Sequence, residues 1–187
     1  MGRLGKQKGS GYEGEICHLL STWWTNGSRD DVFWKTGGSG NRAFGRAKKG
    51  LSTAGQHGDV AAVDSVGEAL IDFATISIKR GYSRNTILDL FDCNQRNIKS
   101  QIWNGFVEDA RTDSLLAGSA TWMIITRRDK RVSTIWMPHD IALELFGEPP
   151  AVCLTLQTND IAIFGTLLDT FFSLVKPSHI EKAASEL

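Results

Sequence analysis

Two apolar segments in the middle of the chain constrain the fold more than any other feature. Residues 59–63 (DVAAV) and 71–79 (IDFATISIK) each combine β-branched or apolar residues over the length of a strand. Residues 65–67 (SVG) between them have the composition of a turn. The sequence therefore predicts two neighbouring strands, and a chain built around them must contain a β-sheet.

Polar residues occupy defined positions on these predicted strands. Asp59 follows Gly58 and opens the first strand, while Ser77 and Lys79 lie two residues apart in the second. Successive side chains of a strand point to opposite faces, so Ser77 and Lys79 project together and Asp72 projects away from them. Ser77 and Lys79 are thus expected to face one cleft.

The remaining pattern predicts an α/β domain with a central mixed β-sheet flanked by helices. Apolar residues at helical spacing predict long helices at residues 11–25 and 98–110. A basic arm at residues 1–10, expected to be flexible, precedes the first helix. At 187 residues the chain is long enough to bury the core of one domain. Further predicted elements are strands at 32–34, 121–126, 132–137, 152–157 and 161–164, a short helix at 138–146 and a terminal helix from Ser178.

The formal net charge is zero, but the charge is unevenly distributed. Residues 32–58 contain no aspartate or glutamate, and the sequence after Met137 leans acidic. A local basic segment matters more than the total charge for binding a phosphate backbone. The glycine-rich loop at 37–58 is therefore predicted to contact phosphates, the alternative being a surface loop without a ligand. The residues expected to bind DNA are Lys35, Ser39, Arg42, Arg46, Lys48 and Lys49.

Several function classes lack support in the sequence. The three cysteines are far apart and no C-x-x-C or H-x-x-x-H pair is present, which argues against a structural zinc site. No G-x-x-x-x-G-K-[ST] phosphate loop and no G-x-S-x-G elbow occurs. No apolar run has membrane-spanning length, and the N-terminus lacks the apolar core of a signal peptide. A cytoplasmic protein without membrane contact is expected.

The residues around the predicted cleft are of the kinds that hydrolyse phosphodiesters. This hydrolysis needs a polarised phosphate and a deprotonated water, which Mg²⁺ provides when carboxylate and carbonyl oxygens bind it. Asp59 and the carbonyl group of Ile78 are predicted ligands of Mg²⁺, with Mn²⁺ as a substitute. Lys79 is expected to orient or deprotonate the attacking water, or to neutralise developing charge.

Several motifs resemble the PD-(D/E)xK nuclease superfamily, particularly its Holliday junction resolvase-like branch. Residues 8–16 (KGSGYEGEI) resemble the start of the helix that carries a catalytic glutamate in these proteins, at the position of Glu13. Residues 36–40 (TGGSG) resemble their Ser/Gly loop. Asp59 matches their aspartate, and residues 77–79 (SIK) match their Glu-x-Lys triplet with serine in the acidic position.

The resemblance covers roughly residues 8–81. The remainder, including residues 136–138 (WMP), is similar to phage and prophage proteins described as endonucleases. The resemblance implies a restriction-endonuclease-like core at residues 11–137, with residues 138–187 as a C-terminal α/β addition to the same domain.

The same resemblance implies a function. It indicates a Mg²⁺-dependent DNA endonuclease that contacts the DNA backbone, with branched DNA as a candidate substrate. Glu13 would be a catalytic residue and metal ligand beside Asp59. Glu13 lies nearer the apolar stripe of the first helix than Glu15 does, so we prefer it as the functional glutamate. A homodimer is expected by analogy, since cutting two strands requires two sites.

Ser77 departs from the superfamily pattern and puts catalysis in question. A neutral hydroxyl binds Mg²⁺ poorly and cannot replace the charge of a carboxylate. Three explanations are open: a natural member that binds DNA without cutting it, a carboxylate supplied from elsewhere (Glu15, or less readily Asp64), or a glutamate replaced by serine to silence a toxic nuclease. The main hypothesis is a nuclease scaffold impaired at position 77. A catalytically inactive DNA-binding module is the alternative, and a protein-interaction domain is a third interpretation.

Overall fold

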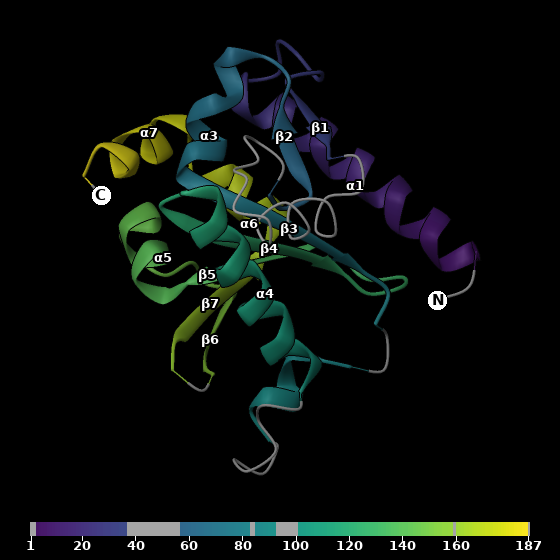
Figure 1. Cartoon of the computed structure of the whole chain (residues 1–187). Coiled ribbons are helices and arrows are strands. Elements are labelled where there is room, and N and C mark those ends of the chain that lie inside the picture. The colour runs from purple at the N-terminus through teal and green to yellow at the C-terminus, as the bar shows by residue number, and fades with distance from the viewer. Residues whose placement is uncertain (1–2, 37–56, 83–84, 93–100, 159, 187) are drawn as a thin grey trace.

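The structure is a computed structural model in which a mixed β-sheet lies between helices (Figure 1). The sheet has five strands in the order β3-β4-β5-β7-β6, and β3 forms one edge. β3 runs parallel to β4, and the other neighbours are antiparallel. The predicted α/β fold with a central mixed sheet is confirmed. The structure describes residues 3–36, 57–82, 85–92, 101–158 and 160–186. The strands of the sheet are Ala74–Arg80 (β3), Thr121–Arg127 (β4), Thr134–Pro138 (β5), Cys153–Gln157 (β6) and Ala162–Leu167 (β7).

A separate two-stranded sheet lies beside the edge strand β3. It pairs Phe33–Lys35 (β1) with Val60–Ala62 (β2) in antiparallel register. The predicted strand at 59–63 is therefore present, but its ladder partner is β1. One link to β3 is the backbone N–H of Asp59, just before β2, which donates a hydrogen bond of 2.8 Å to the carbonyl oxygen of Ile76.

Helices pack on both faces of the five-stranded sheet. None of the helices within the described ranges combines the length and the apolar character needed to cross a membrane. The predicted helix at 138–146 is confirmed, and so are the predicted strands at 121–126, 132–137, 152–157 and 161–164, which pair as β4 with β5 and β6 with β7. The helices are Arg3–Trp24 (α1), Glu68–Phe73 (α3), Ile102–Ala117 (α4), His139–Phe146 (α5), Leu168–Leu174 (α6) and Pro177–Glu186 (α7), with short 3₁₀ turns at Ser65–Gly67 (η1) and Ile87–Leu90 (η2).

Three predicted boundaries are wrong. α1 begins at Arg3, so the segment expected as a flexible arm is helical from there, because arginine, leucine, lysine and glutamine are good helix formers. α4 continues past residue 110 to Ala117 and ends at Gly118, whose φ of +73° is the left-handed conformation of a helix cap.

The division of the chain into a core and a C-terminal addition stays a prediction, although β6 and β7 extend the same sheet as β3.

The third wrong boundary concerns the predicted strand at 71–79. Residues 68–73 (EALIDF) form α3, and β3 begins at Ala74. Leu70 and Phe73 are three residues apart and both buried, which is the spacing of one helix face. Asp72 is thus an exposed helical residue rather than a strand residue facing away from Lys79.

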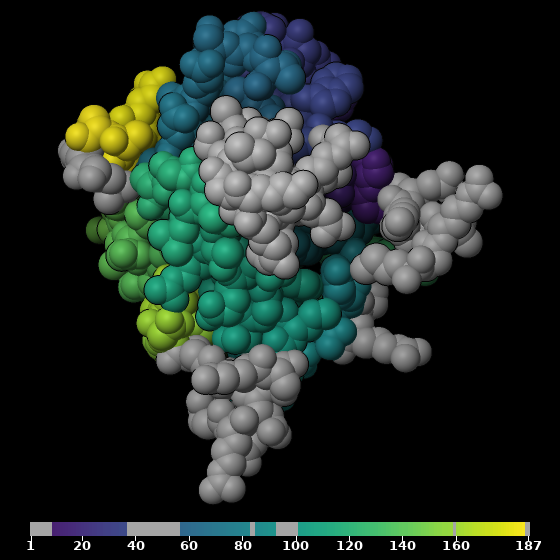
Figure 2. Space-filling view, viewed as in Figure 1, coloured from purple at the N-terminus to yellow at the C-terminus, as the bar shows by residue number. Residues whose placement is uncertain are grey.

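The two faces of the sheet bury separate apolar clusters. Ile76 and Ile78 of β3 belong to the cluster formed with α1, α3, α5, α6 and α7. Ile124 of β4 belongs to the cluster formed with α4 and η2. Figure 2 shows the face that α4 covers. Ser77 lies beside Ile124 in the parallel register, so its side chain is on the α4 face.

Candidate active site

Asp59 is fixed to the free edge of β3 by two hydrogen bonds. Its N–H donates to the carbonyl oxygen of Ile76, and its Oδ2 accepts a hydrogen bond of 2.6 Å from the N–H of Ile78. The N–H and the carbonyl of one strand residue point to the same edge, so the Ile78 carbonyl also faces the Asp59 side. A carboxylate and a backbone carbonyl therefore share this edge.

The glycine before Asp59 permits this close approach. Gly58 has a φ of +73°, and a Cβ atom there would lie 2.8 Å from the carbonyl oxygen of Ile76 and 2.9 Å from Cγ2 of Thr75. On the other side, the hydroxyl of Thr36 donates to the Gly58 carbonyl at 2.8 Å, and the N–H of Thr36 donates to the Asp59 carbonyl at 3.2 Å. The backbone at Asp59 is thus held between β3 and the residue that follows β1.

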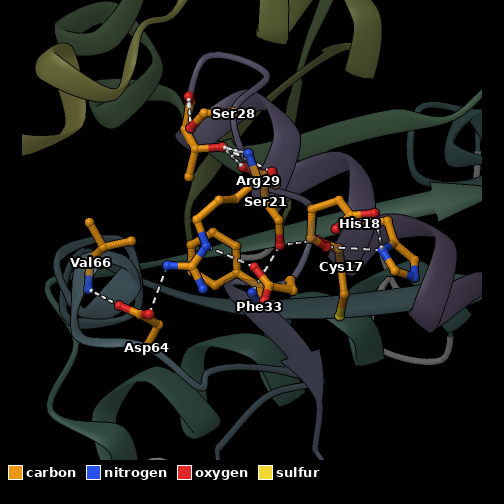
Figure 3. Close-up of polar contacts among 11 residues, drawn as sticks. Cys17, His18, Ser21, Ser28, Arg29, Phe33, Asp64 and Val66 are labelled. Carbon is orange, nitrogen blue, oxygen red and sulfur yellow. Dashed lines mark hydrogen bonds and ion pairs between the residues drawn. The ribbon is translucent and has the colours of Figure 1, made fainter.

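Helix α1 anchors the β1–β2 hairpin through a buried serine (Figure 3). The N–H of Phe33 donates to Oγ of Ser21 at 2.9 Å, and this hydroxyl donates to the Cys17 carbonyl at 2.8 Å. Ser21 is fully buried, so its hydroxyl satisfies a backbone group that water cannot reach. This link connects the helix that carries Glu13 to the hairpin that contains β2.

Asp64 belongs to the same anchoring region. One of its carboxylate oxygens accepts from Nη1 of Arg29 at 2.7 Å, and the other accepts from the N–H of Val66 at 3.0 Å (Figure 3). Both interactions hold the pKa of Asp64 below its usual range, Arg29 being the larger cause. With both oxygens engaged, Asp64 is not available as the carboxylate that Ser77 lacks.

Glu13 of α1 is brought together with Asp59 and Lys79. Burial raises the pKa of Glu13, and the negative charge of Asp59 raises it further, while Lys35 and Lys79 oppose the shift. Glu13 comes from α1, Lys35 from β1, Asp59 from the position just before β2 and Lys79 from β3. This is an arrangement in which two carboxylates and two ammonium groups act on one another.

Glu15 points elsewhere. Its two carboxylate oxygens accept hydrogen bonds of 2.7 and 2.6 Å from the guanidinium group of Arg127 on β4. The hydrogen bond to Arg127 lowers the pKa of Glu15. The structure therefore places Glu13, and not Glu15, with the other predicted site residues, and it leaves no reason to assign Glu15 as the replacement carboxylate.

Ser77 and Lys79 share the α4 face of β3, as strand alternation predicts. Ser77 is only 2 % exposed, and Nζ of Lys79 lies 5.5 Å from the ring centroid of Phe106 on α4. A cation over an aromatic ring is favourable and limits the freedom of a long side chain. Lys79 is thus oriented by α4, while the neutral hydroxyl of Ser77 is buried beneath it.

Comparison with known proteins is consistent with this arrangement. A family model described as "Phage putative PDDEXK endonuclease" matches residues 5–182. The chain belongs to this family. No curated protein and no solved structure matches the chain significantly. Family membership covers almost the whole sequence and agrees with the restriction-endonuclease-like fold.

The predicted DNA-binding residues of this PDDEXK family member are only partly described. Lys35 lies at the end of β1, and its Nζ donates a hydrogen bond of 2.6 Å to Oγ of Ser10 on α1. It is also within electrostatic reach of Glu13. The others lie outside the described residues: Ser39, Arg42, Arg46, Lys48 and Lys49.

One carboxylate near the site was missed at the sequence level. Asp113 of α4 is half-buried, and burial is the main cause that raises its pKa. Electrostatic interactions with His57 and Lys79 lower that pKa, and interactions with Asp109 and Asp59 raise it. Asp113 is therefore within electrostatic reach of two predicted site residues. The signal was hidden because the predicted helix ended at residue 110.

The oxygen atoms at this edge suit a hard divalent cation. The donors are the Asp59 carboxylate, the Ile78 carbonyl and, from α1, the Glu13 carboxylate; Mg²⁺ prefers such oxygens and keeps several waters. In the part of the chain that the structure describes, no three residues of the types His, Cys, Asp and Glu converge closely enough to hold a metal together. The donor set thus fits a cation that is held by few protein ligands and by water.

Basic residues gather where β3 and β4 end. The guanidinium groups of Arg80 and Arg127 lie 5.3 and 4.3 Å from the ring centroid of Tyr12. The turn that follows β4 adds three exposed basic residues, which form no ion pair with any residue that the structure describes. We call these three residues the basic turn: Arg128, Lys130 and Arg131.

Proposed function

We propose that this phage-type PDDEXK protein is a Mg²⁺-dependent DNA endonuclease whose active site is the free edge of β3. The observation that carries the proposal is the hydrogen bond between the Asp59 carboxylate and the N–H of Ile78, which joins the predicted aspartate to the strand of Lys79. The electrostatic contact of Glu13 with Asp59 supports it. Mn²⁺ is expected to substitute for Mg²⁺.

Each side chain has a separate task in this proposal. Asp59 and the Ile78 carbonyl would hold the cation, and Glu13 would act directly or through a water. Bound Mg²⁺ would supply polarisation of the phosphate and a more acidic water. Lys79, held over Phe106, would hold the attacking water or neutralise charge that develops on the phosphate.

The described basic residues support DNA as the partner. Lys35 is within electrostatic reach of Glu13, and the basic turn follows the end of β4. Lysine and arginine contacts to phosphates position a nucleic acid without reading its sequence. The loop at 37–58 would add backbone contacts. Branched DNA as the preferred substrate, a homodimer that cuts both strands and a cytoplasmic location are parts of the same proposal.

Ser77 favours a second candidate function, a DNA-binding module that cuts slowly or not at all. The hydroxyl is neutral and 2 % exposed, so it supplies no charge to a cation at the edge. Loss of one carboxylate from a Mg²⁺ site weakens metal binding more than it changes the fold. The expected protein therefore binds DNA and has low nuclease activity.

A cleavage assay with a restored carboxylate tests the proposed function. Labelled duplex and four-way junction DNA are incubated with the full chain and with its Ser77→Glu variant, in Mg²⁺ and in Mn²⁺. We expect the variant to cleave at least about tenfold faster, since one well-placed charge is worth 10²–10³ in related electrostatic roles. A folded Ser77→Glu protein that binds DNA and cleaves neither substrate would contradict the proposal. Ser77→Asp, which is smaller, serves if the glutamate disturbs packing under α4.

A further inference from the structure

Helix α4 crosses the Ser77 face of β3 in the opposite direction to the strand. Near the start of α4, the ring of Phe106 meets Nζ of Lys79 at 5.5 Å. Just beyond the end of α4, Oγ of Ser119 hydrogen-bonds Oγ1 of Thr75 at 2.8 Å. The middle of α4 is therefore level with Ser77, between these two contacts.

Asp113 lies on this middle part of the helix. It is seven residues after Phe106, which is almost two turns, so the two side chains leave the same stripe of α4. Seven residues advance about 10 Å along a helix, while Ser77 and Thr75 lie about 7 and 13 Å before Lys79 along the strand. Asp113 thus comes level with the stretch of β3 from Thr75 to Ser77.

Asp113 is half-buried and lies within electrostatic reach of the edge where Asp59 lies. It interacts electrostatically with His57, Asp59 and Lys79. These three residues belong to the edge segment before β2 and to the end of β3. Asp113 is therefore on the active-site side of α4 and not on its solvent side.

His57, one of the residues that act electrostatically on Asp113, carries a buried polar atom without a partner in the described part of the chain. Nδ1 of His57 is buried and has no hydrogen-bond partner among the residues that the structure describes. Buried polar atoms are nearly always satisfied, by protein groups or by bound water. A bound water would satisfy this nitrogen, and Mg²⁺ retains a hydration shell through which a carboxylate outside its direct ligands can act.

We propose that Asp113 of α4 supplies the negative charge that Ser77 does not, by holding a water of the cation bound at Asp59. This inference rests on the proposed function. Asp113 acts through water, because no three acidic, histidine or cysteine side chains in the described part of the chain converge on one point. Asp113 is therefore a positioning residue for the cation. It lies on helix α4, whereas the usual acidic residue would lie on β3 at the position of Ser77.

Binding of Mn²⁺ alone, measured by electron paramagnetic resonance on the full chain, tests the inference without relying on activity. Asp113→Asn keeps the size of the side chain and removes its charge. We expect its Mn²⁺ affinity to fall by about 10–100-fold, the usual effect of losing a group that supports a metal's ligands. Glu108→Gln is the matched control, since Glu108 is exposed on the same helix, and its affinity should stay within about twofold of the wild type.

A rescue variant separates a metal role from a structural one. In Asp113→Asn/Ser77→Asp, a charge returns at the strand position, and Mn²⁺ affinity should recover to within about threefold of the wild type. Asp113→Glu, which retains the charge, should bind Mn²⁺ better than Asp113→Asn if the asparagine variant proves poorly folded.

The outcomes are distinguishable from those of the proposed function. Wild-type Mn²⁺ affinity in Asp113→Asn would overturn the role of Asp113, even if Ser77→Glu cleaves DNA. Loss of affinity in Asp113→Asn with recovery in the double variant would support that role, even if no variant cleaves DNA. Absence of Mn²⁺ binding by the wild type and also by Ser77→Glu would overturn both proposals. Binding by Ser77→Glu alone would support the proposed function and overturn the role of Asp113.

Discussion

The carboxylate of Asp59 accepts a hydrogen bond of 2.6 Å from the N–H of Ile78, although Asp59 leads into a strand of another sheet. Asp59 leads into β2, which pairs with β1, while Ile78 lies in the edge strand of the five-stranded sheet. This hydrogen bond holds the Asp59 carboxylate at the edge of β3, next to the residue that precedes Lys79. Predictions about fold and site both depend on this junction.

The first prediction concerns the glycine that permits the junction. Gly58→Ala should lower the free energy of unfolding by about 2–4 kcal/mol for two reasons. Alanine is strained at the positive φ of this position, and its Cβ would clash with the Ile76 carbonyl oxygen. Urea unfolding measures the change. Gly118→Ala is the matched control, since Gly118 has the same φ of +73° and a Cβ there would meet nothing within 4 Å. Equal losses in the two variants would show that no close approach exists at Gly58.

The second prediction separates the charge of Asp59 from its hydrogen bond. Asp59→Asn retains an oxygen that can accept from Ile78, whereas Asp59→Ala leaves that N–H without its acceptor. The alanine variant should lose about 1–3 kcal/mol of stability and the asparagine variant less, while both should lose Mn²⁺ binding by at least about tenfold. Calorimetric titration with Mn²⁺ checks the second part. Unchanged Mn²⁺ affinity in Asp59→Asn would remove Asp59 from the site.

The third prediction uses the opposite environments of Glu13 and Glu15. The pKa of Glu13 is raised in the folded protein, chiefly by burial, so the ionised form that prevails at neutral pH is unfavourable there. The stability that this residue contributes is complete below its unfolded pKa and is lost as the pH rises through the folded pKa. Glu13→Gln should therefore be more stable than the wild type at pH 7, and the gain should vanish below about pH 4.5.

Glu15→Gln provides the opposite case. The hydrogen bond to Arg127 lowers the pKa of Glu15, so its contribution is present at neutral pH and is lost as the pH falls below the usual carboxyl range. Because the Glu15 side chain is 45 % exposed, solvent screening limits the loss in Glu15→Gln at pH 7 to about 0.5–1 kcal/mol. Urea unfolding from pH 3.5 to 8 measures both variants. If both variants changed the free energy of unfolding at pH 7 in the same direction, the placement of the two glutamates would be contradicted.

The fourth prediction concerns the basic turn. Replacing Arg128, Lys130 and Arg131 with alanine should weaken DNA binding at low salt and make it less sensitive to salt. The slope of log affinity against log salt should become shallower by about 0.9 for each phosphate contact removed. Fluorescence anisotropy with a labelled duplex measures the slope. Lys176→Ala, at an exposed position between α6 and α7, is the control, and an equal slope in the triple variant would exclude the turn from the interface.

The sequence predicted the strand that carries the site better than the elements around it. Alternation along a strand depends only on local geometry, so the shared face of Ser77 and Lys79 was predictable. The partner of Asp59 was not, because β2 pairs with β1, and it is the segment just before β2 that hydrogen-bonds to β3. The helix at 68–73 was missed because its short apolar run fits a strand and a helix equally well.

The electrostatic partners of the site depend on contacts between distant segments. Glu13 was identified from the resemblance of its helix to a known family, and the structure places it near Asp59. Asp113 has no local motif, and its position follows only from the length of α4 and from the contact of Phe106 with Lys79. A single sequence contains no signal for that packing.

The most direct test of the central claim is a crystal structure of the full chain soaked in Mn²⁺, with the ion located by its anomalous scattering. We expect a peak about 2 Å from both the Asp59 carboxylate and the Ile78 carbonyl, with water in most of the remaining coordination positions. The same soak of Asp59→Asn should show no ion there. A fully soaked wild-type crystal with an ordered Asp59 and no ion at the edge of β3, or with Mn²⁺ bound only at other residues, would contradict the assignment of this edge as the active site.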